Sequence, residues 1–176
     1  DMIDRNEFEM GKGLRVDCHM QTSVPHIYAV GDCCETRELV TGQPMGVLTW
    51  ANAGLQGTVA GENIAGKDAV FQGNLLHNIT HFFDMDFIGL GDNRRAGARI
   101  HYVHPRAGWT YDAIIADGRP VCINIFENRR LSGPARLALI RQMAEQDAVL
   151  NAAERFALKQ AGLPENLITW KSGVVL

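Results

Sequence analysis

The stretch "TSVPHIYAVGDCCE", residues 22–35, decides how the first part of this chain is expected to fold. Four consecutive apolar residues, 27–30, lie between Pro25 and the pair Gly31-Asp32. A short run that is apolar on both faces and bounded by turn residues is typical of a strand inside a covered parallel sheet. We therefore predict a buried strand over 27–30 that ends in a sharp turn at Gly31-Asp32.

The position of Asp32 suggests a binding role. In open α/β sheets, ligands bind at the carboxyl ends of the strands. An ionised carboxylate accepts hydrogen bonds and donates none, so it suits the hydroxyl groups of a sugar or sugar alcohol and repels phosphate. The alternative is that Asp32 caps a turn, which aspartate often does. The Gly-Asp pair alone leaves both interpretations open.

A helix is predicted over residues 47–65, "VLTWANAGLQGTVAGENIA", with Gly66 and Lys67 as its C-terminal stop. The free N–H groups and the positive dipole end at its start favour an anion or an electron-rich ring. Glycine inside a helix costs up to about 1 kcal/mol relative to alanine. The several small residues in this helix therefore indicate the close approach of another surface.

The second half of the chain reads as strands followed by a helix. Strands are expected over 82–92 and 98–104, and a β-hairpin is expected around Asp117-Gly118, between two arms rich in β-branched residues. Ser132-Gly133-Pro134 is expected to open a helix, since proline is tolerated in the first turn. This helix runs toward Gly162, with a break near Gln146-Asp147.

Composition excludes several classes of protein. The 176 residues are 46% apolar and 21% charged, and the net charge of −3 argues against nucleic-acid binding. No apolar run approaches the ~20 residues that a membrane span needs, and the first residues lack the layout of a signal peptide. Four cysteines without CxxC spacing predict reduced thiols in a cytoplasmic protein.

The longer pattern around Gly31-Asp32 is more specific than the pair itself. A Thr-Ser-x-Pro lead, an Ile-Tyr-Ala run, the Gly-Asp pair and a Gln-Gly/Ala-Gly/Asn-Ile helix follow in this order within residues 22–67. The pattern resembles the second FAD-binding segment of the pyridine nucleotide-disulfide oxidoreductase superfamily. It is most similar to the branch of NADH oxidases, rubredoxin or ferredoxin reductases and NADH-binding nitrite reductases. The stretches "ITHFFDMDFIGLGD" and "YDAIIADGRPVCINIF" resemble the small C-terminal domain of such reductases.

This resemblance implies an α+β protein with two parts. Residues 1–70 would be the tail of an α/β FAD-binding domain. Residues 71–176 would be a small α+β C-terminal domain, with an antiparallel sheet and a C-terminal helix, that packs on the first part or mediates dimers. Because no GxGxxG motif occurs in a strand–turn–helix context, the resemblance implies a C-terminal fragment of a longer enzyme.

The resemblance also implies which residues bind the cofactor. Asp32 would bind the ribityl chain of FAD, and Gly31 would permit the turn. Backbone N–H groups at Leu48, Thr49 and Trp50 would approach the pyrimidine edge of the flavin, where reduction places negative charge. Neither a catalytic residue nor a metal ligand is expected in this chain.

The implied function is electron transfer from NAD(P)H through FAD to an acceptor, such as a small redox protein. The chain alone is expected to be inactive, and its partners would be the N-terminal FAD and NADH domains that it lacks. A bare strand over 27–30 also predicts that the chain alone forms a homo-oligomer, swaps segments or leaves residues 1–45 disordered. The alternative hypothesis is a non-catalytic interaction or dimerisation module, which the absence of catalytic residues favours.

Other residues carry weaker signals. His77 and His81 are spaced i,i+4, but a third zinc ligand and an HExxH glutamate are missing. Cys33 and Cys34 are expected to pack rather than to act in redox chemistry. Five arginines form either a basic patch for an acidic partner or a solvated face: Arg94, Arg95, Arg99, Arg129 and Arg130. Two tryptophans, Trp109 and Trp170, are expected to pack against other side chains.

Overall fold

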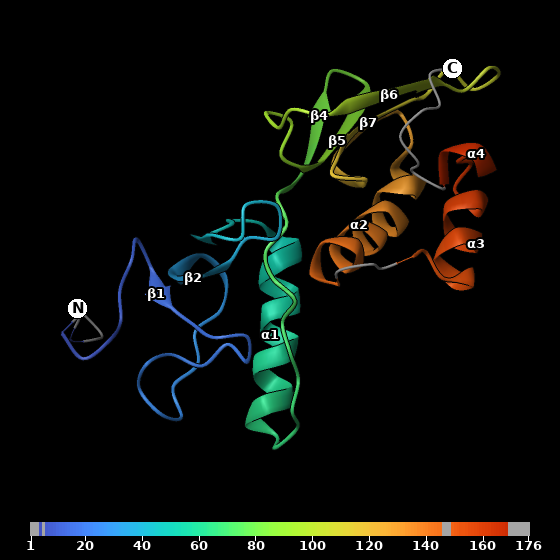
Figure 1. Ribbon diagram of the computed structural model, residues 1–176. Helices are drawn as coiled ribbons and strands as arrows, with labels where there is room; N and C mark the ends of the chain where they lie inside the picture. The colour runs from blue at the N-terminus through green and yellow to red at the C-terminus, as the bar shows by residue number, and fades with distance from the viewer. Residues whose placement is uncertain (1–3, 5, 146–148, 169–176) are drawn as a thin grey trace. The chain divides into compact units, whose positions relative to one another are not determined.

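The computed structural model describes residues 4, 6–145 and 149–168. The chain forms two compact units, Asp1–Leu75 and Leu76–Leu176, each described by itself below. Helices combine with a largely antiparallel sheet (Figure 1), so the predicted α+β class is confirmed. The division between the units falls after residue 75, whereas the sequence placed the boundary after residue 70.

The first unit is built around one helix and a small sheet. Strands β1 (Leu14–Arg15), β2 (Cys34–Arg37) and β3 (Pro44–Met45) form the sheet in that order, with β1 parallel and β3 antiparallel to β2. A short 3₁₀ helix, η1 (Gly31–Cys33), leads directly into β2, and helix α1 (Trp50–Ile64) follows β3. The turn at Gly31-Asp32 therefore joins the N-terminal loops to the sheet.

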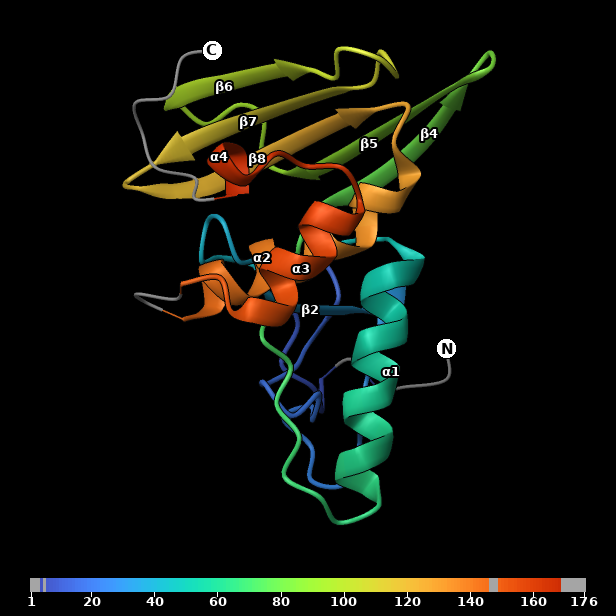
Figure 2. The ribbon, with the colours of Figure 1, turned by 90° about the vertical axis from the view of Figure 1, so that its right-hand side faces the viewer.

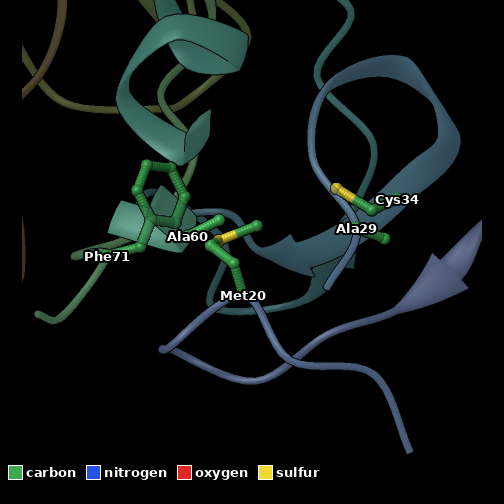
Figure 3. Packing of buried hydrophobic residues seen from close by; sticks show 5 residues of the cluster. All are labelled: Met20, Ala29, Cys34, Ala60 and Phe71. Atoms are coloured by element: carbon green, nitrogen blue, oxygen red, sulfur yellow. The ribbon is translucent and has the colours of Figure 1, made fainter. Parts of the chain in front are cut away.

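The core of this unit is small and draws on segments far apart in the sequence. Figure 3 shows Met20 of the N-terminal loop close to Ala60 of α1 and to Phe71 beyond the helix. The backbone N–H of Phe71 also donates to the carbonyl of Cys18 at 2.7 Å. Burial of these side chains, together with Ala29 and Cys34, holds the loops against α1.

Helix α1 starts and stops where local chemistry dictates. The hydroxyl of Thr49 caps the helix by accepting from the N–H of Asn52 at 3.4 Å. Beyond the other end, Gly66 adopts φ +83°, and its N–H bonds the carbonyl of Asn63, which confirms the predicted stop. The close approach expected at the helix glycines is not seen in the part of the chain that the structure describes, since an added Cβ would meet nothing within 4 Å at Gly54, Gly57 or Gly61.

The predicted strand over 27–30 is wrong. Tyr28 makes only a single antiparallel bridge to Gln21, and the N–H of Ala29 bonds the carbonyl of Met20 at 3.1 Å. The side chain of Ile27 is 42% exposed, so the run is not covered on both faces. A strand needs a hydrogen-bonded neighbour along its length, and among the described residues this run bonds only to a short loop around Met20 and Gln21 and to its own turn. Because residues 27–30 form no strand, they do not provide the bare strand from which a homo-oligomer was predicted.

The second unit contains a five-stranded antiparallel sheet with the spatial order β4-β5-β8-β7-β6. Each strand pairs with its neighbour through a continuous ladder, apart from a register shift between Ile114 and Ile115 of β7. The strands are β4 (His77–Phe82), β5 (Met85–Gly91), β6 (Ala98–Val103), β7 (Thr110–Ala116) and β8 (Arg119–Phe126).

The hairpin between β7 and β8 is the predicted one. Asp117 and Gly118 have φ of 52° and 74°, the two positive values of a type I′ turn. Val121, Ile123 and Ile125 are buried as expected. Their alternation along β8 thus fixes the face on which the core of this unit forms.

The strand predicted over 82–92 corresponds to β5, and a further strand that was not predicted, β4, precedes it. A turn at Phe83-Asp84, with Phe83 at φ 51°, separates β4 from β5. The sequence of β4, "HNITHF", is too polar to show a buried pattern, and the apolar pair Phe82-Phe83 marks the turn rather than the strand. Phe83 is 85% exposed there.

Helices cover one face of this sheet. Helix α2 (Arg129–Ala144) packs on β8 and β5, and α3 (Ala152–Gln160) packs on α2, as Figure 2 shows. The short α4 (Glu165–Ile168) follows. Among the described residues, none of the helices is long and apolar enough to cross a membrane.

The start of α2 corrects the prediction that Pro134 lies in the first turn. The helix begins at Arg129, so Pro134 is in its interior, although an interior proline removes a hydrogen bond. Burial of Leu131 brings the earlier turn into the helix, whereas Leu137 is exposed. The predicted break at Gln146-Asp147 lies outside the described residues.

Substitution of two glycines of this unit by alanine should change the free energy of unfolding in opposite directions. A Cβ at Gly91, which has φ +74°, would lie 2.2 Å from the carbonyl oxygen of Val121, whereas a Cβ at Gly133 in α2 would meet nothing within 4 Å. We expect Gly91→Ala to lower the free energy of unfolding by about 1–3 kcal/mol or more. Gly133→Ala should raise it by about 0.5–1 kcal/mol.

Denaturant unfolding of the two variants, compared with the unaltered chain, measures both effects. A Gly91→Ala variant as stable as the unaltered chain would contradict the register of β5 against β8.

Candidate functional site

The turn at Gly31-Asp32 is held by its backbone. Gly31 has φ +75°, a conformation that residues with a side chain rarely adopt. Its N–H donates to Oε1 of Gln56 on α1 at 2.6 Å. A Cβ at Gly31 would lie only 3.5 Å from Cβ of Ala53, which is ordinary contact. The turn therefore needs glycine for its backbone conformation rather than for space.

Asp32 presents a free carboxylate at this turn. The residue is exposed, and no side chain or backbone group of the described residues donates a hydrogen bond to its carboxylate. It lines a hollow of about 520 Å³ together with Leu48, Thr49 and Trp50, and with Ala53 and Gly54 of α1. A second hollow of about 370 Å³, on the side of Lys12 and Met45, also includes Asp32 and Leu48.

The hollow thus brings together four of the five predicted cofactor-binding residues, and Gly31 adjoins it through Ala53. The start of α1 supplies N–H groups at Trp50 and Ala51, which no intrahelical carbonyl can satisfy. Thr49 contributes differently from the prediction, because its N–H already donates to the carbonyl of Val47 at 2.8 Å. Its hydroxyl serves as the helix cap instead.

Apolar side chains surround these polar groups. Trp50 is 97% exposed and Leu48 is 67% exposed. Large apolar side chains left so bare beside a carboxylate and a helix N-terminus mark a surface that a ligand or another protein surface covers. The arrangement suits a molecule with hydroxyl donors at one end and a flat, electron-rich ring at the other.

A buried polar network lies behind the turn. Nε2 of Gln56 donates to Oδ1 of Asn74 at 2.8 Å, and Nδ2 of Asn74 donates to the carbonyl of Met45 at 2.8 Å. Nδ2 of Asn52 donates to the carbonyl of Leu75 at 3.0 Å. None of these three residues was predicted from the sequence. The available signal was the i,i+4 spacing of Asn52 and Gln56, which places two polar side chains on one face of a helix rich in small residues.

The adjacent cysteines differ in environment. Cys33 is exposed, whereas Cys34 is buried and its Sγ lies 3.6 Å from Oε1 of Gln56. Burial, with Cys33 and Asp32 as further contributions, raises the pKa of Cys34 to about 11. Cys34 is therefore a neutral thiol at pH 7 and a poor nucleophile, which supports the prediction of a packing role.

The histidines do not form a metal site. His77 and His81 lie on strand β4, where residues four apart are roughly 13 Å from one another along the strand. Nε2 of His77 lies 3.4 Å from Oγ of Ser132, and Nδ1 of His81 pairs with Asp86. No cluster of three potential metal ligands occurs within the described ranges.

The arginines are not a uniform basic patch. Arg94 pairs with Asp92 through two nitrogens, at 2.8 and 3.2 Å, and Nε of Arg129 lies 3.5 Å from Asp86. Because aspartates partly neutralise the charges of these two arginines, the interpretation as a solvated face is favoured over a basic patch. Trp109 is buried and packs against Tyr102, as predicted, while Trp170 lies outside the described residues.

The four thiols should differ in reactivity. Cys18 and Cys33 are exposed, whereas Cys34 and Cys122 are buried. Because an alkylating agent attacks the accessible thiolate, we expect rapid labelling of Cys18 and Cys33 and protection of Cys34 and Cys122 until the chain unfolds. Peptide mass spectrometry after timed labelling measures this. Equal labelling of Cys33 and Cys34 would contradict the burial of Cys34.

The same thiols predict a loss of stability at high pH. Burial raises the pKa of both Cys34 and Cys122 from 9.0 to about 11, so the unfolded chain ionises first. Their contribution is fully present below pH 9 and is lost as pH rises through about 11. The free energy of unfolding should fall over this range, and more shallowly in a Cys34→Ala variant. An equally steep fall in that variant would remove Cys34 as a source.

Comparison with known proteins shows which proteins the first part of this chain resembles. The sequence profile described as pyridine nucleotide-disulphide oxidoreductase matches residues 2–57. An NAD(P)H sulfur oxidoreductase (CoA-dependent) of Pyrococcus furiosus is 42% identical over 76 residues, which are 42% of this chain and 17% of that protein. An NADH oxidase of Methanocaldococcus jannaschii is 40% identical over 84 residues, which are 47% of this chain and 19% of that protein. The matched stretch thus spans less than a fifth of either relative.

Solved structures show the same fold over more of the chain. An FAD-dependent pyridine nucleotide-disulphide oxidoreductase from Desulfovibrio vulgaris aligns with a TM-score of 0.66 and 23% identity, over 92% of this chain and 44% of that one. An NAD-dependent persulfide reductase from A. fulgidus aligns with a TM-score of 0.63 and 25% identity, over 88% and 34%. The resemblance read from the sequence is confirmed over residues 2–57, which match the sequence profile of the pyridine nucleotide-disulphide oxidoreductases.

Proposed function

We propose that the protein carrying this chain is an FAD-dependent NAD(P)H oxidoreductase, and that the hollow at Asp32 holds part of the FAD. The observation that carries the proposal is an exposed carboxylate with no hydrogen-bond donor among the described residues, which lines the same hollow as the start of α1. The names of the relatives, an NADH oxidase and an NAD(P)H sulfur oxidoreductase, support it.

The residues present fit such a cofactor. The carboxylate of Asp32 is an acceptor, so it matches the hydroxyl donors of the ribityl chain and disfavours the phosphates. The N–H groups at the start of α1 match the pyrimidine edge of a flavin, where electron density increases on reduction. Bound FAD supplies the redox chemistry, by accepting hydride from NAD(P)H and passing electrons onward.

The roles of the individual residues follow from this fit. Asp32 accepts hydrogen bonds from ribityl hydroxyls, and Gly31 provides the backbone conformation that places it there. Thr49 caps α1 so that the N–H of Trp50 stays directed outward at the helix start. The exposed side chains of Leu48 and Trp50 exclude water from the flavin once it is bound.

The electron acceptor and the partners form part of the same proposal. A putidaredoxin reductase solved in complex with putidaredoxin shares the fold, with a TM-score of 0.64 at 14% identity. We propose a small redox protein as acceptor, FAD and NADH domains that complete the enzyme, and a homo-oligomer. The free state of all four cysteines is consistent with the cytoplasm.

One observation favours a second role for the second unit, as an interaction or dimerisation module. At the end of β4 and the turn that follows, Phe82, Phe83 and Met85 are all exposed, and exposed apolar clusters commonly mark interfaces. A protein that oligomerised through this unit but bound no flavin at its full natural length would favour the module over the enzyme.

The carboxylate provides the direct test. Because hydrogen bonds to charged groups contribute about 1.5–3 kcal/mol, Asp32→Ala should weaken FAD binding by roughly 10- to 100-fold. Flavin-free protein of full natural length, titrated with FAD by fluorescence, gives the dissociation constant. Asp68→Ala is the matched control, since its side chain is 95% exposed and pairs with His19 at 3.6 Å.

We expect the control to bind FAD like the unaltered protein. Equal affinity in Asp32→Ala, or a preparation that takes up no flavin at all, would overturn the proposed function.

A further inference from the structure

We infer that Gln56, held in place by Asn74, is the positioning residue for Asp32. This inference rests on the proposed function, because it assigns the group that orients the carboxylate toward FAD. Gln56 itself does not line the hollow; it acts through the backbone of the turn.

The first step is the bond between Gln56 and the turn. The N–H of Gly31 donates to Oε1 of Gln56 at 2.6 Å. Gly31 directly precedes Asp32 and has a left-handed backbone, which glycine adopts without strain. Fixing the N–H of Gly31 fixes the plane of the Val30–Gly31 peptide, from which the turn into Asp32 starts. The carboxylate itself has no donor among the described residues, so its direction depends on that backbone.

The second step is the anchor behind Gln56. Asn74 accepts from Nε2 of Gln56 and donates through Nδ2 to the carbonyl of Met45, both at 2.8 Å. The backbone N–H of Asn74 donates to the carbonyl of Arg37, the last residue of β2, at 2.7 Å, and the carbonyl of Asn74 accepts from the N–H of Leu39 at 2.8 Å. Asn74 is thus fixed at four points, and Gln56 has one side-chain orientation that suits it.

The third step is the direction of the chain of hydrogen bonds. A backbone N–H only donates and a backbone carbonyl only accepts, so Gly31 at one end and Met45 at the other fix which atom of each amide faces which neighbour. Gln56 and Asn74 are 2% and 0% exposed, so water does not compete for these groups. The network therefore has one arrangement, and it sets the turn relative to α1.

This geometry joins the two halves of the site. The carboxylate belongs to η1, whereas the N–H groups belong to the start of α1, and Gln56 lies on α1 itself. A flavin that contacts both halves requires a fixed spacing between them, because misplacement of either one weakens binding. Gln56 supplies that spacing.

The test is a double-mutant cycle on the protein at its full natural length. Gln56→Met keeps the size of the side chain and removes its hydrogen bonds to Gly31 and Asn74, and we expect it to weaken FAD binding about tenfold, the effect of losing one or two such bonds. If Gln56 acts through Asp32, the same substitution in an Asp32→Ala background should change the affinity less than about twofold.

A further measurement separates positioning from general stability. Amide hydrogen exchange at Gly31 in the flavin-free protein should be slow with Gln at position 56 and fast with Met. Gln72→Met is the matched control, because Gln72 is exposed, and it should leave both readouts unchanged.

The outcomes distinguish the two proposals. An equal loss of affinity from Gln56→Met with and without Asp32, or slow exchange at Gly31 in Gln56→Met, would overturn the positioning role while leaving the proposed function intact. If Asp32→Ala has no effect of its own, the proposed function fails first. Should Gln56→Met not fold, Asn74→Ala, which removes the anchor of Gln56, takes its place: unchanged exchange at Gly31 and unchanged FAD affinity in that variant would overturn the positioning role.

Discussion

The hydrogen bond from the N–H of Gly31 to Oε1 of Gln56, at 2.6 Å, is the interaction on which the site depends. It joins a left-handed turn in a loop-rich region to the one long helix of the first unit. The hydrophobic core here consists of only a few buried side chains, so apolar burial alone does not define the turn closely. Directional bonds between buried amides do so, because they are satisfied in only one arrangement.

The chemistry of the hollow follows from the elements that this bond aligns. A turn contributes an acceptor, a helix start contributes donors, and exposed apolar side chains contribute a surface that excludes water. Each feature alone is common in proteins and carries little meaning. Their convergence within one hollow, in a chain similar over part of its length to an NAD(P)H sulfur oxidoreductase and an NADH oxidase, supports the proposal of a flavin site over a solvent-exposed loop.

Local sequence signals predicted only part of this structure. The hairpin at Asp117-Gly118 and the stop at Gly66 follow from positive φ angles that few residues adopt, so they were predictable. Residues 27–30 were misread, because a run of apolar residues shows burial tendency but not whether a neighbouring strand exists. Pro134 was misplaced because burial of Leu131 extends α2 by a turn, an effect of packing that helix-start signals do not contain.

The site shows the same limit. Asp32 and the helix start were recognised from an ordered motif within one stretch of chain, while Gln56 and Asn74 were missed. Their importance arises from contacts among residues 31, 45, 56 and 74, which the sequence separates and only the fold brings together. Polar residues on the buried face of a small-residue helix are the signal that deserves weight in similar chains.

The most direct measurement is a crystal structure of the protein at its full natural length with FAD bound. The account predicts a carboxylate oxygen of Asp32 within about 3 Å of a ribityl hydroxyl, with the start of α1 facing the pyrimidine edge of the flavin. A cofactor that bound elsewhere and left Asp32 in contact with solvent alone would contradict it.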